Sequence, residues 1–143
     1  MALCRHGLAC IEILMQNEME FGVADPVFDK KDQLKQIEES LLDGEHILAV
    51  YDAIGVATGF IGMTNKRVII MDKSFVGERI ALTSIPYARI SSVSVTSNRS
   101  FAGQYFSSGS LAIHVGTSIY EVEFRGDKKT HHTHQLILHH ITL

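Results

Sequence analysis

The spacing of apolar side chains changes twice along the chain. Between residues 25 and 45 they recur at intervals of three and four, which predicts an amphipathic helix. Asp25 is suited to cap this helix, Pro26 to occupy its first position and Gly44 to end it. The expected buried stripe consists of Leu34, Ile37, Leu41 and Leu42.

From residue 46 onwards the apolar residues alternate with polar ones, and β-branched residues become frequent. This pattern is typical of short strands separated by turns. Gly116 and Thr117 indicate a tight hairpin, and the glycines in the second strand indicate bending or a close backbone approach. About seven strands are expected, at residues 46–53, 57–64, 67–73, 78–87, 89–97, 110–116 and 118–124.

The helical period returns after Gly126, with Asp127 as the expected cap. On this helix Ile137, Leu138 and Ile141 share an arc of about 100°, which we expect to be buried. Strands followed by a helix exclude alternating βαβ units. The pattern therefore predicts a mainly β (α+β) domain: an antiparallel barrel or sandwich capped by a C-terminal helix, with an additional N-terminal helix.

Composition narrows the classes of protein that this chain can represent. Its hydrophobic content is 45% and its charged content 20%, which is ordinary for a soluble globular protein. The net charge of −3 gives no overall attraction to nucleic acid, so we expect no nucleic-acid partner. Both cysteines, Cys4 and Cys10, precede the predicted strands, which fits a reducing compartment. We predict a cytoplasmic protein.

The first two dozen residues differ from the rest of the chain. Charged residues interrupt the apolar run that a secretion signal requires, and Met15 and Met19 are both suited to be the true start. We predict that residues 1–24 are a disordered leader or a start-site overcall, and that residues 25–143 form a single domain. The mass of the native protein would test this.

Four stretches resemble the bacterial pleckstrin-homology-like (PH-like) family. They are LLDGEHILAVYDA (41–53), GMTNKRVIIMD (62–72), SIPYARISSVSV (84–95) and YEVEFRGDKKTHHTHQLILHH (120–140). The resemblance covers roughly residues 29–143 and implies seven antiparallel strands capped by a C-terminal helix. It also implies a non-enzymatic domain that forms closed, ring-like homo-oligomers through its strand edges. A hydrophilic surface between adjacent subunits would then contact other proteins, and ring closure would pair open strand edges.

Two of these stretches contain candidate contact residues. In TNKR, Lys66 and Arg67 fit either a hairpin turn or a contact with an anion or a partner, and we favour the turn. In SIPYARI, Tyr87 and Arg89 fit either a corner between strands or a partner contact, and we favour the corner. Residues 45–65 contain no lysine or arginine, although lipid-binding members of the wider fold carry cations there. We therefore expect no specific phosphoinositide binding, while weak membrane association stays open.

The loop over residues 98–109 contains three aromatic residues in a polar, glycine-containing segment: Phe101, Tyr105 and Phe106. Exposed aromatic residues on a loop are suited to protein contacts, although these could equally fold back over the barrel mouth. This loop is the best local candidate for a partner or inter-subunit surface.

Five of the eight histidines lie between residues 131 and 140. On a helix no two of them are four residues apart, the spacing that helical zinc ligands commonly use, so we predict no metal site. We expect His132, His139 and His140 to point outward, toward solvent or a neighbouring subunit. If they face a neighbour, assembly would respond to pH, because unperturbed histidine titrates near pH 6.5.

No catalytic motif stands out. The sequence has no GxSxG elbow and no phosphate-binding loop, and Glu121 and Glu123 fit the solvated face of a strand. We predict a non-catalytic binding or scaffold module without a cofactor, forming a cyclic homo-oligomer with an unidentified protein partner. The alternatives are a peripheral membrane or lipid-headgroup binding domain, and a metal-dependent enzyme that uses the C-terminal histidines.

Overall fold

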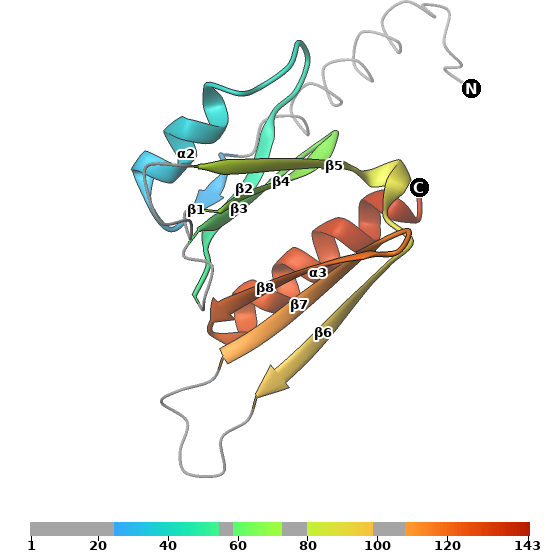
Figure 1. The fold of residues 1–143 in the computed structure, drawn as a ribbon. Coiled ribbons are helices and arrows are strands. Elements are labelled where there is room, and N and C mark those ends of the chain that lie inside the picture. The colour runs from blue at the N-terminus through green and yellow to red at the C-terminus, as the bar shows by residue number, and fades with distance from the viewer. Residues whose placement is uncertain (1–24, 55–58, 73–79, 99–107) are drawn as a thin grey trace, which may run out of the picture.

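The computed structural model describes residues 25–54, 59–72, 80–98 and 108–143. Within these ranges two sheets are covered by two α-helices (Figure 1). The elements are β1 (Val27–Phe28), α2 (Lys31–Glu38), β2 (Ile47–Asp52), β3 (Phe60–Thr64), β4 (Arg67–Asp72), β5 (Ala81–Pro86), the 3₁₀ turn η1 (Tyr87–Arg89), β6 (Ser92–Asn98), β7 (Ser108–Val115), β8 (Ser118–Arg125) and α3 (Asp127–Ile141).

The strands form a sandwich of two separate sheets. The first sheet has the order β1-β2-β3-β4-β5 and is antiparallel except for β1, which runs parallel to β2. The second sheet is the antiparallel set β6-β7-β8. One bridge joins them, where the Ile54 amide donates to the Glu123 carbonyl at 2.8 Å. The predicted mainly β fold with two flanking helices is confirmed, as a sandwich whose described strands do not close into a barrel.

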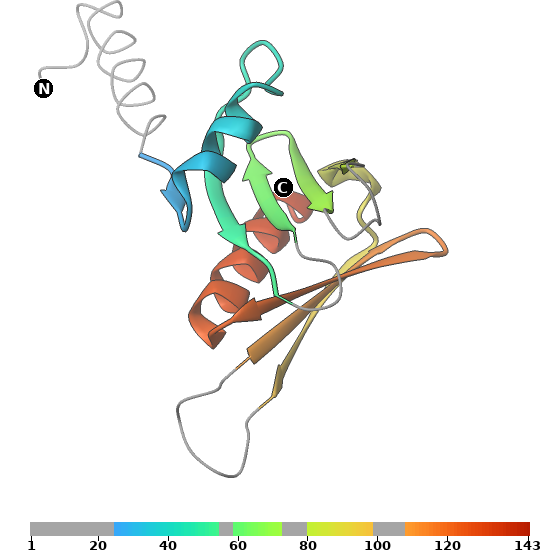
Figure 2. The same cartoon turned by 60° about the vertical axis from the view of Figure 1, so that its left-hand side comes forward.

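The middle strands of the first sheet, β2, β3 and β4, are largely buried on both faces. Ile37 of α2 packs on one face with Val50, Phe60 and Ile69, and the opposite face packs against the second sheet and α3. Figures 1 and 2 show the two helices on opposite sides of this sheet. Burial on both sides explains why every residue of β3 is buried and why its sequence lacks an alternating polar face. A Cβ at Gly62 would lie 3.0 Å from Ile37 Cδ1, so the glycine admits α2 closely.

The second sheet has one covered face and one open face. Burial alternates along β7, as expected for a strand between the core and water. Its inner residues, including Leu111 and Ile113, pack with Ile137 of α3. The helix approaches so closely at Gly109 that an added Cβ would lie 2.2 Å from Thr130 Oγ1.

The predicted helix over residues 25–45 is too long. Only Lys31–Glu38 is helical, and Lys30, not Asp25, precedes its first turn. Residues before the helix pair with β2 instead: the Asp29 amide donates to the Val50 carbonyl, and the Asp29 carboxylate accepts from the Asp52 amide. These long-range bonds compete with helix formation and explain the later start. Gly44 lies in the turn before β2, with φ of +73°, and Leu42 is exposed.

The predicted buried arc of α3 is wrong at Leu138, whose side chain is 41% exposed. Ile137 is fully buried together with Thr130 and Thr133. The two threonine hydroxyls donate to carbonyls one turn back on the same helix, which satisfies their polar atoms inside the core. The close approach at Gly109 requires a small side chain on this face, and an apolar pattern alone does not reveal that requirement.

Candidate functional site

Arg67, at the start of β4, is held by its own chain. Its Nε donates to Glu45 Oε1 at 2.9 Å and its Nη2 to Glu45 Oε2 at 3.2 Å. The same guanidinium donates to the Ser40 carbonyl at 2.6 Å and to Ser84 Oγ at 2.7 Å. The Glu45 side chain is fully buried, and its Oε2 also accepts from the Leu42 amide. Arg67 therefore links β4 to Ser40, Glu45 and Ser84 at one end of the first sheet. Its guanidinium is engaged by these contacts and is not available to a ligand.

The TNKR segment forms the turn between β3 and β4. Thr64 Oγ1 donates to Glu45 Oε1 at 2.7 Å and accepts from the amides of Lys66 and Arg67. The exposed Lys66 donates through Nζ to the Asp43 carbonyl at 2.8 Å. These contacts favour the turn interpretation of this segment over an anion site.

The charge of Glu45 is stabilised where it lies. Burial raises the pKa of the carboxyl, but hydrogen bonds from Arg67, Thr64 and the Leu42 amide outweigh burial. Together they lower the pKa of Glu45 from 4.5 to about 2. The pair with Arg67 is therefore ionised at any physiological pH. No local sequence pattern indicates the role of Glu45, because its contact with Arg67 depends on how β4 lies against the segment before β2.

Tyr87 forms the corner after β5. It is buried, and its hydroxyl donates to the Thr64 carbonyl at 2.6 Å. Its ring stacks on the His140 ring of α3, with centroids 4.4 Å apart and planes 18° apart. Burial raises the pKa of Tyr87 far above its ordinary value of 10, so the phenol stays protonated. The geometry favours the corner interpretation, and Arg89 is exposed beside it.

The expectation that three histidines of α3 point outward is wrong for two of them. His132 Nδ1 lies 2.5 Å from the hydroxyl of Tyr51 in β2. His140 Nδ1 lies 2.8 Å from the Leu136 carbonyl, and its ring stacks on Tyr87. Both are half-buried because core tyrosines pack against this helix, whereas His139 is exposed. The three loop aromatics, Phe101, Tyr105 and Phe106, lie outside the described residues.

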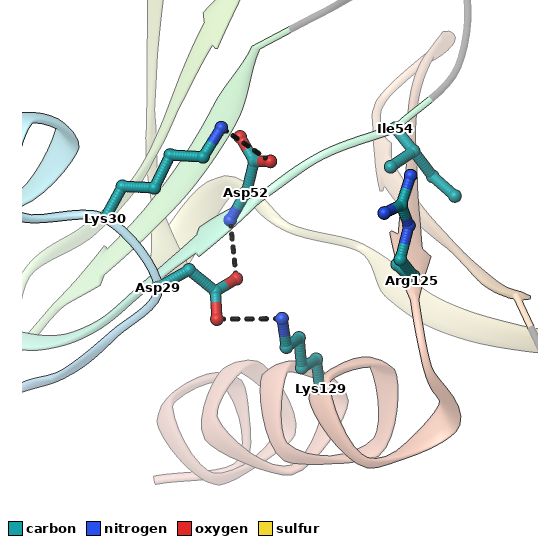
Figure 3. A pocket seen from close by; sticks show the side chains of 6 residues that line it. All are labelled: Asp29, Lys30, Asp52, Ile54, Arg125 and Lys129. Atoms are coloured by element: carbon teal, nitrogen blue, oxygen red, sulfur yellow. Dashed lines mark hydrogen bonds and ion pairs between the residues drawn. The ribbon is translucent and has the colours of Figure 1, made fainter.

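A charged pocket of about 430 Å³ lies beside β2, β8 and the first turns of α3 (Figure 3). Lys129 Nζ contacts Asp29 Oδ1 at 2.8 Å, and Lys30 Nζ contacts Asp52 Oδ2 at 3.0 Å. Among the described residues the Arg125 guanidinium makes no hydrogen bond or ion pair. No local sequence pattern indicates this pocket, since the pocket combines residues that are far apart in the chain.

The carboxyl of Asp52 is also held as an anion. Burial raises its pKa, but hydrogen bonds from Gln33 and Lys30 and the positive charge of Lys129 outweigh burial, so the pKa lies below its ordinary value. Gln33 Nε2 donates to Asp52 Oδ1 at 2.6 Å. The pocket therefore consists largely of cations and anions that neutralise one another.

A second cavity, of about 560 Å³, is a slot between β8 and the ends of β2, β3, β4 and β5. Its β8 side runs from Ile119 to Glu123. Its other side includes Ile54, Gly59 and Met71. The slot lies next to the Ile54–Glu123 bridge, where β8 and the first sheet are close but no described strands pair.

The described residues contain neither a metal-binding cluster nor a membrane-spanning helix. No three histidine, aspartate or glutamate side chains converge in a geometry that could hold a metal ion there. In the same ranges no helix is both long enough and apolar enough to cross a bilayer.

Two sheets with a C-terminal helix packed between them define the PH-like fold. A pleckstrin homology domain from Shewanella amazonensis is similar, with a TM-score of 0.61 and 19% identity over 80% of this chain and 100% of that one. A DUF1696 family protein with a pleckstrin-homology domain from Shewanella loihica has a TM-score of 0.60 and 20% identity, covering 79% and 94%.

At these identities the two structures establish the fold alone. The sequence itself matches the bacterial PH domain family over residues 15–141. The chain belongs to that family. No curated protein matches the sequence.

Proposed function

We propose that the protein is a non-catalytic, cytoplasmic binding or scaffold module that forms a cyclic homo-oligomer and contacts other proteins. The observation that carries this proposal is the edge of β5. Ile80, just before β5, and Leu82 within it are 60% and 46% exposed. Large exposed apolar side chains at a strand edge favour association with another chain.

Two of the strand edges, those of β5 and β6, come from different sheets and suit such an assembly. In the described part of the chain, β5 pairs only with β4, and β6 pairs only with β7. A contact between two different edges is head-to-tail, and it closes into a ring when the rotation between neighbours divides a full turn. Pairing β5 of one subunit with β6 of the next would cover Leu82 and satisfy both edges.

Native mass spectrometry and light scattering of the full chain test this assembly. The wild-type protein should give one mass equal to a whole number of subunits greater than two. Leu82→Lys places a charge in the proposed contact and should shift the mass toward the monomer. Leu42→Lys, at a similarly exposed leucine away from the strand edges, should leave the mass unchanged. A monomeric wild-type protein at micromolar concentration would overturn the proposal.

The other two functions have less support from the contacts. Lys66 and Arg67, which a lipid headgroup would need, are engaged by their own chain. Among the described residues, no three histidine, aspartate or glutamate side chains converge where they could hold a metal ion. Co-sedimentation with anionic vesicles and metal analysis of untagged protein would each reveal such a function if it exists.

A further inference from the structure

We propose that the free edge of β8 and the slot beside it bind an extended peptide in which basic and apolar residues alternate. The peptide would add as a further strand to the second sheet. The inference rests on the proposed role in protein contacts and names the class of partner, but it does not require ring assembly.

The hydrogen-bonding groups of β8 show which residues would receive the strand. The Glu123 carbonyl accepts from the Ile54 amide, so the backbone groups of Glu123 point away from β7. Along a strand these groups alternate in direction, so those of Ile119 and Glu121 also point away from β7. Within the described residues no strand pairs with β8 at these positions. Each therefore has one backbone donor and one acceptor that no described strand pairs with and that an incoming backbone could use.

The existing bridge makes this edge a natural site for strand addition. Ile54 already occupies the position opposite Glu123, at one end of the stretch that contains Ile119 and Glu121. A peptide strand placed opposite Ile119 and Glu121 would continue the line that Ile54 begins. It would occupy the slot of about 560 Å³ and cover the ends of the first sheet.

The side chains of the slot select the kind of peptide. Apolar contacts are available from Ile70 and Val122 and from Ile119, which is 57% exposed. The described residues that line the slot include Glu121 and Glu123 but no lysine, arginine or histidine. Neither glutamate forms an ion pair with a described residue. A strand therefore matches the slot when alternate side chains are apolar and the others are cationic, because β-strand side chains alternate between two faces.

The same charges argue against other ligands. A nucleic acid or an anionic headgroup would face Asp72, Glu121 and Glu123, with no cation among the described lining residues to balance them. Backbone pairing with β8 also requires an extended chain of peptide groups, which neither ligand supplies.

The test uses the full chain and a fluorescent ten-residue peptide of alternating lysine and valine. Fluorescence anisotropy should show saturable binding, and a peptide of alternating glutamate and valine should not bind. In ¹⁵N-detected hydrogen exchange, the lysine peptide should slow exchange of the Ile119 and Glu121 amides. Binding without this protection would overturn strand addition at β8, even if the affinity were high.

Two substitutions test the charge and the backbone separately. Glu121→Lys should weaken binding about fivefold or more, whereas Glu38→Lys, the same charge change on the exposed face of α2, should leave it within twofold. Ile119→Pro removes the outward amide and should abolish binding, whereas Ile119→Thr keeps the amide and should retain most of it. Equal losses for Glu121→Lys and Glu38→Lys would show binding to net charge alone and overturn the proposal.

Ring assembly and peptide binding can be separated by repeating the titration with Leu82→Lys. If this variant is monomeric and still binds the peptide, both proposals stand. If the wild type is monomeric and binds the peptide, the ring fails and the β8 site stands. If the wild type is a ring and no amide of β8 is protected, the ring stands and the β8 site fails.

Discussion

The two sheets of this domain differ in how completely their polar and apolar groups are matched. The first is covered on both faces over β2, β3 and β4, and the Glu45–Arg67 pair at its end has its hydrogen bonds made by the chain itself. The second is covered on one face, and β8 keeps an edge without a described partner over Ile119 and Glu121. The buried centre of the first sheet supplies stability, whereas the edge of β8 is the part of the second sheet that we propose for peptide binding. Lys66 and Arg67, the charged residues that the sequence offered as ligand contacts, instead bind groups of their own chain at the turn between β3 and β4.

The largest expected effect comes from breaking the ion pair of the first sheet. Arg67→Ala leaves the Glu45 carboxylate buried without its partner, which should lower the free energy of unfolding by about 3–5 kcal/mol. Urea unfolding followed by circular dichroism measures this loss. Lys66→Ala, which removes one exposed hydrogen bond in the same turn, should cost about 1 kcal/mol or less. A similar small loss for Arg67→Ala would contradict the assigned role.

The next effect is a dependence of stability on acid. Because the folded-state pKa of Glu45 is about 2, below its ordinary 4.5, its contribution to stability is complete above pH 4.5. That contribution is lost as the pH falls from about 4.5 to 2, and it amounts to about 3 kcal/mol at 1.4 kcal/mol per pH unit. Unfolding measured at several pH values should show this slope in the wild type. In Glu45→Gln the slope over the same window should be smaller, and an unchanged slope would place the acid sensitivity elsewhere.

The smallest effect tests the second sheet. Gly109→Ala forces a Cβ toward Thr130, so thermal unfolding should report a loss of about 1–3 kcal/mol. Thr130→Ala in the same chain should restore part of this loss, because it removes the hydroxyl that lies nearest. On the open face of the sheet, Ser94→Ala should change the free energy by about 0.5 kcal/mol or less. If Gly109→Ala and Ser94→Ala lower the free energy of unfolding by the same amount, the two faces of the sheet do not differ in packing as described.

The second sheet could be predicted closely from the sequence, and the first less so. Strands with one wet face, such as β7, alternate visibly, and their positions follow from that period. The segment before α2 was misassigned because bonds from Asp29 to β2 override its local helical pattern. The pairing of Glu45 with Arg67, and of His132 with Tyr51, depends on strand register and helix rotation, which local periodicity does not determine. The slot at β8 depends on how far apart the two sheets lie, and no local sequence pattern indicates that distance.

The contact between Tyr51 and His132 has a consequence for how the chain reaches this structure. The two residues are 81 positions apart, and their contact forms only when β2, the second sheet and α3 have come together. Residues so far apart in the chain can meet only after a large loop has closed. The entropy cost of closing it comes before the contact contributes any stabilisation, which slows folding. We therefore expect folding in the millisecond-to-second range of β-rich domains, with α3 docking late. Until then, the inner faces of both sheets remain exposed to the same chain and to its neighbours.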